Sequence, residues 1–247
     1  MFKDCQKSVY SEWRDDTGGV VLWVGDPDCQ AAHDAILRWL QENCPLFSTQ
    51  SAEDDNILRG NLGETITFCA GHWSVFNDTL AHAFTANALN PFGKGSRPGI
   101  DIVWIRFGAT PDDDVAVLQE VKTTGAPSLT LADNLISDYD KLFGTDPRFT
   151  LHTRLQDIKN KLEYEHGRPE LCPRMTELAG QSPQTSPQVR LFPTLVHERH
   201  ESDPRTKMLA IRETLCGKGW VRQAVQAWAI GFFDLNDRLL RLAQGLQ

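Results

Sequence analysis

The sequence predicts an α/β fold, and three features of its middle section support this. A nearly continuous apolar run, GIDIVWIRF (99–107), is typical of a strand that is covered on both faces. After the turn GATPDDD, the run VAVLQEVKTT (115–124) has the composition and alternation of a second strand. Amphipathic patterns at helical spacing lie on both sides of this strand pair. Strands flanked by helices favour a layered α/β domain over an all-helical or all-β one.

The elements before the strand pair divide the chain into two parts. We expect residues 1–53 to form a small acidic unit, in which VVLWVG (20–25) is a strand followed by a helix. Residues 54–247 then form the main domain. It opens with a helix from about 54 to 71, whose apolar residues recur at helical spacing, and continues through a Gly- and Pro-rich loop at 91–98.

The region after the strand pair begins with helices. The apolar patterns at 129–143 and 151–165 predict two of them. Residues 167–188 are rich in Pro, Ser and Gln, which breaks this pattern. They predict a long surface loop.

The last part of the domain alternates strands and helices. VRLFPTLV (189–196) predicts a strand, in which Pro193 indicates either a position at the sheet edge or a bulge. A helix at 204–216 and a strand at 225–233 follow. A final helix is predicted from Leu235 onward, because leucines recur there at helical spacing.

Length and composition indicate an ordinary globular protein. The 247 residues are 40% hydrophobic and 23% charged, and such a chain can form its own core. No apolar run approaches the roughly 18 residues that a membrane span needs, and the N-terminus lacks the pattern of a signal peptide. We therefore expect a cytoplasmic protein with no membrane partner. The cysteines form no CxxC pair, and the nearest histidines, in HERH (197–200), lack the spacing of a helical zinc site.

Charge is distributed unevenly along the chain. The formal net charge is −8, and residues 1–64 account for −7 of it with 5 Lys+Arg against 12 Asp+Glu. Residues 190–222 have the opposite character, with 7 Lys+Arg against 4 Asp+Glu. Phosphate contact is conceivable in this basic stretch, although such a run is more often a solvated face.

Residues suited to catalysis lie at the start of the first central strand and near the end of the second. Asp101 begins the first strand, and Glu120 and Lys122 lie two apart on the second, so both project from one face while Val121 packs on the other. A charged pair in an apolar central strand is costly unless something compensates it. A divalent cation held by Asp101 and Glu120 would do so, because Mg²⁺ is usually bound by one or two carboxylates together with water and phosphate.

These residues resemble the PD-(D/E)XK nuclease superfamily. GID (99–101) and EVK (120–122) match its motif, and a helix bearing a glutamate lies upstream. The resemblance implies a restriction-endonuclease-like αβββαβ core with N-terminal and C-terminal additions. It covers about 54–165, with a final core strand at either 189–196 or 224–233.

The resemblance also implies roles for four residues. Asp101 and Glu120 would bind Mg²⁺, for which Mn²⁺ is expected to substitute, and Lys122 would activate or orient the attacking water. Glu64 is the candidate for the assisting carboxylate of the first helix. The activity implied is hydrolysis of phosphodiester bonds in DNA. Ile100 stands where the family often has Pro, and no QxxxY motif follows the second strand, so the RecB-like subgroup is not supported.

A narrower similarity concerns the biological setting of such an enzyme. The RGxLGE helix, the GxD and ExK strands and the helix-rich C-terminal part are similar to nuclease subunits of bacterial anti-phage defence systems, notably HamA of Hachiman. This similarity implies a helicase or ATPase subunit as a protein partner. An acidic nuclease with little basic surface binds DNA poorly alone, which suits restraint or delivery by another subunit.

Three other interpretations stay open at this point. The chain could be a sequence-specific restriction endonuclease with the same chemistry, or an inactive nuclease-like module that only binds a partner or nucleic acid. Glu120 and Lys122 could also be a salt-bridged pair on an exposed strand face. The choices between DNA and RNA, and between single and double strands, are equally open.

Overall fold

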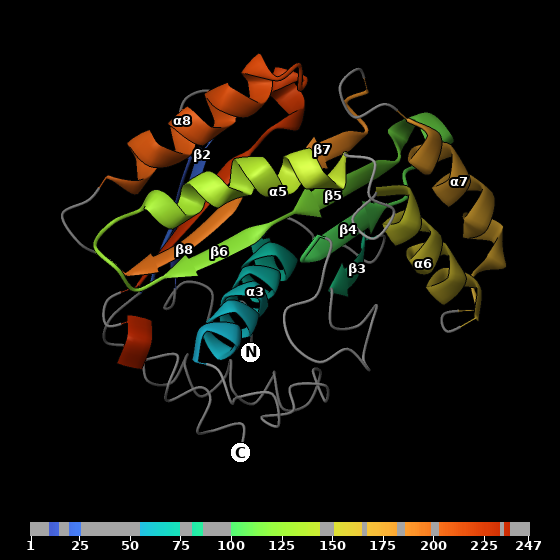
Figure 1. Ribbon diagram of the computed structural model, residues 1–247. Helices are drawn as coiled ribbons and strands as arrows, with labels where there is room; N and C mark the ends of the chain where they lie inside the picture. Colours follow the sequence, from blue (N-terminus) through green and yellow to red (C-terminus); the bar gives the residue numbers. More distant parts are fainter. Residues whose placement is uncertain are drawn as a thin grey trace.

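The computed structural model describes residues 10–14, 20–25, 55–74, 81–85, 100–143, 151–164, 167–181, 186–198, 203–232 and 235–237. Its strands are β1 (Tyr10–Arg14), β2 (Val20–Gly25), β3 (Ala81–Thr85), β4 (Ile102–Arg106), β5 (Val115–Gln119), β6 (Val121–Thr124), β7 (Val189–Leu191), β8 (Thr194–Glu198) and β9 (Ala227–Phe232). Its α-helices are α3 (Asp55–Ser74), α5 (Asn134–Leu142), α6 (Leu151–Tyr164), α7 (Cys172–Gly180) and α8 (Pro204–Gly217). The protein is therefore of the mixed α/β class, as predicted (Figure 1).

Two sheet segments join along a pair of central strands. One segment has the order β3-β4-β5-β7 and the other β1-β2-β9-β8-β6. The chain passes from β5 to β6 through Glu120, and from β7 to β8 through Phe192 and Pro193. Two backbone hydrogen bonds bridge the junction: the Phe192 N–H donates to the Leu118 carbonyl (2.9 Å), and the Thr194 N–H donates to the Glu120 carbonyl (2.8 Å). Glu120 thus lies where two neighbouring strands cross from one segment into the other.

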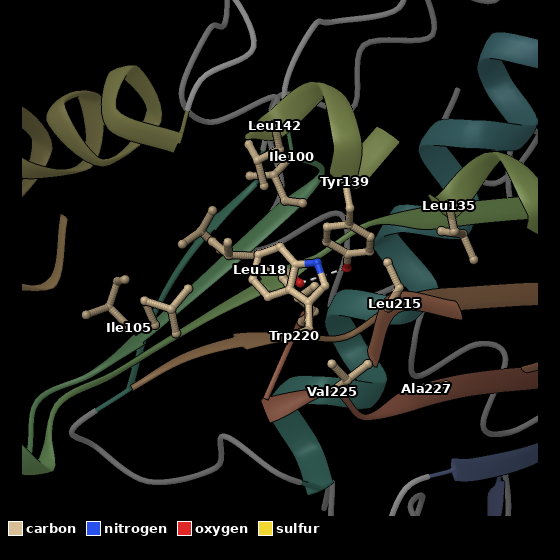
Figure 2. Close-up of a cluster of buried hydrophobic side chains, with 14 of the residues drawn as sticks. Ile100, Ile105, Leu118, Leu135, Tyr139, Leu142, Leu215, Trp220, Val225 and Ala227 are labelled. Carbon is tan, nitrogen blue, oxygen red and sulfur yellow. Dashed lines mark hydrogen bonds between the residues drawn. The ribbon is translucent and has the colours of Figure 1, made fainter. Parts of the chain in front are cut away.

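Different helices cover the two faces of the sheet. Side chains alternate along β4, so Val103 and Ile105 face the main hydrophobic core, which also contains apolar side chains of α5, α6, α7 and α8. Trp104 faces the other way and stacks on Phe68 of α3, with ring centroids 5.2 Å apart. Figure 2 shows the main core, with Tyr139 of α5 beside the strands. The helices thus hold the central strands from both sides.

Most predicted helices and strands are confirmed. The helices at 54–71, 151–165 and 204–216 correspond to α3, α6 and α8. The strands at 20–25 and 225–233 correspond to β2 and β9, which pair in parallel. The helix predicted at 129–143 begins as a short 3-10 helix and becomes α-helical only in α5. The strand predicted at 115–124 is split into β5 and β6.

Several other elements were not predicted or lie outside the described residues. Neither β1 nor β3 was predicted from the sequence. The helix expected after β2, the loop at 91–98 and most of the last helix lie outside the described residues, although residues 235–237 are helical. The domain boundary between residues 53 and 54 stays a prediction.

The long surface loop predicted at 167–188 is wrong. A short 3-10 helix (Pro169–Leu171) and the helix α7 occupy much of this segment. Leu171, Met175 and Leu178 recur at helical spacing and are buried against α6 and the sheet. Pro173 caused the error, because proline near a helix start is compatible with the helix and fixes its first turn.

The strand containing Pro193 is central, so the predicted edge position is wrong. β8 pairs in parallel with β6 on one side and with β9 on the other. The strand is interrupted at this point, but its pairing keeps one register, with Leu118 beside Leu191 and Val121 beside Thr194, so Pro193 marks no bulge either. The pairing also shows that 189–196, and not 224–233, adjoins the strand that carries Glu120.

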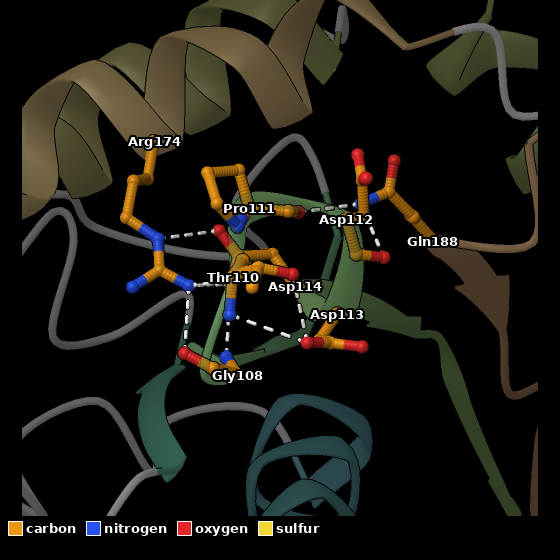
Figure 3. A network of polar contacts seen from close by, with 8 residues as sticks. All are labelled: Gly108, Thr110, Pro111, Asp112, Asp113, Asp114, Arg174 and Gln188. Carbon is orange, nitrogen blue, oxygen red and sulfur yellow. Dashed lines mark hydrogen bonds and ion pairs between the residues drawn. The ribbon is translucent and has the colours of Figure 1, made fainter.

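Arg174 attaches α7 to the turn between β4 and β5 (Figure 3). Its guanidinium forms an ion pair with Asp114, whose side chain is 1% exposed, and donates to the carbonyls of Gly108 (2.9 Å) and Thr110 (3.1 Å). It also lies over the Phe107 ring, 5.2 Å from its centroid. The predicted turn is therefore a fixed structure, and it sets the start of β5.

Candidate active site

The strand register brings Asp101 beside Glu120. Ile102 of β4 pairs with Gln119 of β5, so the next residues outward are Asp101 and Glu120. Both face the α5 side of the sheet, because they continue the alternation of Val103 and Leu118. The Val121 N–H donates to Asp101 Oδ2 over 2.7 Å. This bond fixes the Asp101 carboxylate at the junction between β5 and β6.

Lys122 lies between two carboxylates. Its Nζ is 3.0 Å from Glu120 Oε1 and 2.7 Å from Asp138 Oδ2 on α5. Lys141, one turn further along α5, binds the other oxygen of Asp138 at 2.7 Å. Glu120 is only 6% exposed, so this is not the exposed strand pair that remained possible from the sequence.

The site carries excess negative charge. Burial raises the pKa of Asp101, and the charge of Glu64 raises it further, although Lys122 opposes this. Burial likewise raises the pKa of Glu120, and the neighbouring Asp101 adds to the effect. Each carboxylate therefore makes the other harder to ionise, and only a cation or a proton can relieve the repulsion.

The lysine and the helix aspartate respond in the opposite way. Burial acts to lower the pKa of Lys122, but the adjacent carboxylates outweigh it and hold that pKa well above its usual value. Burial acts to raise the pKa of Asp138, but hydrogen bonds from Lys122 and Lys141 keep it below its usual value. Lys122 is therefore an ammonium group and Asp138 a carboxylate at neutral pH.

Glu64 reaches the site from the opposite side of the sheet. It lies on α3, is partly buried, and is close enough for its charge to act on Asp101. The helix can approach because Gly63 packs directly against Thr123 of β6, where a Cβ would overlap the threonine hydroxyl. Glu64 is thus near Asp101, as its predicted role requires, but its connection is weaker than that of the three strand residues.

Tyr139 supports the junction from within the core. Its hydroxyl donates to the Leu118 carbonyl (2.9 Å) and accepts from the Glu120 N–H (3.3 Å). The ring is 1% exposed and packs among the apolar side chains of Figure 2. Glu120 therefore has its backbone held by α5 as well as by the adjacent strand.

The donor set at this site suits a hard divalent cation. Asp101 and Glu120 offer carboxylate oxygens, which Mg²⁺ prefers, and Mg²⁺ needs few protein ligands because it keeps several waters. Four carboxyl groups (Asp101, Glu120, Asp138 and Glu64) face two lysines (Lys122 and Lys141), so full ionisation leaves an excess of two negative charges. One divalent cation would balance it. Within the described residues no group of three or more His, Cys, Asp or Glu side chains is arranged to hold a metal.

The basic stretch at 190–222 is mostly used within the fold. Lys207 pairs with Asp133, Lys218 with Asp140, and Arg222 with Glu213. Arg212 is buried and donates to the Val225 carbonyl. These four residues are therefore engaged within the fold, which reduces the positive charge that they offer to phosphate.

Asp138 is the site residue that the sequence argument missed. It precedes Tyr139 in ISDYDKL, beside the apolar face of α5 formed by Leu135, Tyr139 and Leu142. A carboxylate bordering the buried face of the helix after the ExK strand was the available signal. Its partner could not be read from the sequence, because Lys122 and Asp138 are brought together only by the packing of α5 on β6.

Comparisons with known proteins do not add to this geometry. No protein-family model and no curated protein matched the chain. None of the helices that the structure describes is long and apolar enough to cross a membrane.

Proposed function

We propose that this chain is a Mg²⁺-dependent nuclease of the PD-(D/E)XK superfamily. The order of its elements supports this proposal: α3, β3, β4, the β5–β6 strand, α5 and the β7–β8 strand correspond to the αβββαβ core. The last of these strands runs parallel to the ExK strand, and the first three are antiparallel neighbours. β1, β2, α6, α7, α8 and β9 are additions to that core.

One observation carries the proposal. Asp101, Glu120 and Lys122 come from two strands and converge at one junction. The two carboxylates there are so close and so buried that ionising both is unfavourable unless a cation binds. A fold under selection for stability alone has no reason to keep this arrangement. A metal site does have one, since the strain disappears when the ion binds.

The chain's own groups have separate tasks in this proposal. Asp101 and Glu120 hold the cation, and Lys122 presents a fixed ammonium group to the reacting phosphate and water. When bound, Mg²⁺ would supply a polarised phosphoryl oxygen and a more acidic water. Glu64 would orient a water or the ion from the α3 side. The fixed backbone at Val121 and Glu120 keeps these groups aligned, which is the main requirement of such a site.

We further propose DNA as the substrate, and a helicase or ATPase subunit as the partner, in a cytoplasmic anti-phage defence system. Two observations favour dependence on a partner. The net charge is −8, and Lys207, Lys218 and Arg222 already have carboxylate partners. A nuclease with this surface gains little from phosphate contacts of its own.

Cleavage assays test the activity directly. The purified chain, alone and with any subunit that co-purifies, is incubated with plasmid, single-stranded DNA and RNA in Mg²⁺, Mn²⁺ or EDTA. We expect degradation of DNA that requires the metal and stops in EDTA. Discrete plasmid fragments would indicate a restriction endonuclease, binding without cleavage would indicate an inactive module, and undiminished cleavage in EDTA would contradict the metal mechanism.

Substitution of two residues separates metal binding from chemistry. Glu120→Ala removes a ligand, so both Mn²⁺ affinity and cleavage should fall. Lys122→Ala leaves both carboxylates in place, so Mn²⁺ should still bind while the rate falls by about 100-fold or more, as when one group that stabilises transition-state charge is lost. Calorimetric Mn²⁺ titration beside the cleavage assay decides this, and wild-type activity in Lys122→Ala would end the assignment.

A further inference from the structure

The Lys122 ammonium bridges a residue of the site and a residue outside the recognised motif. Glu120, on one side, is the proposed metal ligand, and Asp138, on the other, belongs to α5. The contact to Asp138 is the shorter of the two, at 2.7 Å against 3.0 Å. Lys122 is therefore held at least as closely by the helix as by its neighbour on the strand.

This arrangement matters when a cation takes up Glu120. The carboxylate would then turn toward the metal, and Lys122 would lose its contact with Glu120 Oε1. A lysine with no other partner would either remain on Glu120 and compete with the metal, or move into solvent because its long side chain is flexible. Asp138 prevents both outcomes, since it offers a second carboxylate at the same place.

We infer that Asp138 is a positioning residue, which draws the Lys122 ammonium off the metal ligand Glu120 and fixes it beside the reacting phosphate. This inference rests on the proposed nuclease function. Asp138 acts through Lys122 and does not itself touch the metal or the substrate.

The contacts of Asp138 suit it to this positioning role. Its Oδ1 accepts from Lys141 at 2.7 Å while Oδ2 binds Lys122, so each oxygen already has an ammonium partner. Its side chain is only 19% exposed. The next residue, Tyr139, is anchored on Leu118 and Glu120, which fixes this turn of α5 relative to the strand.

Asp138→Asn tests the role, with Asp140→Asn as the matched control. Asp140 lies on the same helix, and its carboxylate pairs with Lys218 at the surface, away from Lys122. We expect Asp138→Asn to lower kcat by about 10-fold or more, the effect of losing a group that orients a metal site. It should also weaken Mn²⁺ binding, because Lys122 then rests on Glu120 alone. Asp140→Asn should leave both quantities unchanged, and Asp138→Glu should restore part of the rate.

The Lys122→Ala background shows whether Asp138 acts through the lysine. There, Asp138→Asn should change Mn²⁺ affinity much less than in the wild-type protein, because there is no lysine to redirect. An equal loss in both backgrounds would mean that Asp138 acts only through its charge, and unchanged kcat and Mn²⁺ affinity in the single variant would also overturn the inference. If the wild-type protein binds Mn²⁺ but does not cleave nucleic acid, the proposed nuclease function is wrong. The Mn²⁺ affinities of the wild-type protein and Asp138→Asn would then still test the role of Asp138.

Discussion

Asp101 and Glu120 form a buried acidic pair that costs the fold stability. Both are acidic, close together and shielded from water, and the pKa of each is raised by burial and by neighbouring acids. Such groups destabilise the metal-free fold at neutral pH, because the unfolded chain ionises them freely. This loss of stability distinguishes the pair from ordinary surface carboxylates more clearly than their place in a motif does. Two measurements can test it.

Asp101→Asn should make the metal-free protein more stable and inactive. The amide oxygen can still accept from the Val121 N–H, while the charge that repels Glu120 is removed. We expect a gain of about 1 kcal/mol, which raises the Tm of a chain of this size by about 2 to 4 °C. Thermal denaturation in EDTA measures the gain, and a cleavage assay measures the loss. A lower Tm would mean that Asp101 contributes to the fold rather than straining it.

The stabilising effect of Mg²⁺ should increase with pH. Asp101 and Glu120 have folded-state pKa values well above those of the unfolded chain, because burial and neighbouring carboxylates oppose ionisation. Their protonation therefore favours the fold at low pH, and this contribution is lost as pH rises through the folded-state values. Mg²⁺ binds only the ionised pair, so the Tm difference with and without Mg²⁺ should be small near pH 4 and widen upward. A difference independent of pH would place the ion elsewhere.

At the scale of elements, the contact between α3 and β6 determines whether Glu64 can reach the site. Gly63 packs against Thr123, whereas Gly60, nearly one turn earlier, has nothing within 4 Å of where a Cβ would lie. The same substitution at the two positions should therefore have opposite effects.

Gly60→Ala should stabilise the protein by about 0.5 to 1 kcal/mol, because alanine is the better helix former and meets no obstacle. Gly63→Ala should lower both Tm and cleavage, since α3 must move away from β6 and carries Glu64 with it. Thermal denaturation and cleavage rates of the two variants provide the comparison. Equal effects at both positions would mean that the close approach has no consequence for the site.

Elements that are determined by a local sequence pattern could be predicted. Elements that depend on packing against distant parts of the chain could not. α3, α6, α8 and β9 were each located correctly from local sequence, β9 as a nearly continuous apolar run. α7 was missed because its three buried apolar residues are spread among prolines and polar residues. The split at Glu120 was missed because no turn or breaker residue marks it in 115–124.

The same distinction applies to the site. Asp101, Glu120 and Lys122 could be found because alternation on two successive strands places them together. Lys122 was expected to activate or orient the attacking water, and no partner for it was named. Its contact with Asp138 depends on how α5 crosses the sheet, which no local pattern records.

At the scale of the whole molecule, Arg174 connects the helical layer to the sheet at a distance from the site. Arg174→Ala would leave Asp114 buried and without its cation (Figure 3). We expect a loss of about 3 kcal/mol, which lowers Tm by about 6 to 12 °C. Arg168→Ala, which breaks an exposed pair with Glu170 just before the same helix, should leave Tm nearly unchanged. Activity per folded molecule should be normal in both, and an equal Tm in the two variants would contradict the role assigned to Arg174.

The pairing of the central strands also orders events during synthesis on the ribosome. Leu118 pairs with Leu191, and Val24 pairs with Gly231, so the strand that carries Glu120 is completed only by residues made much later. Contacts between such distant residues form slowly, because a long loop must close first. A nascent chain that has not yet produced β8 cannot fix Glu120 and Lys122 at the junction. The arrangement of Glu120 and Lys122 therefore forms only after β8 has been synthesised.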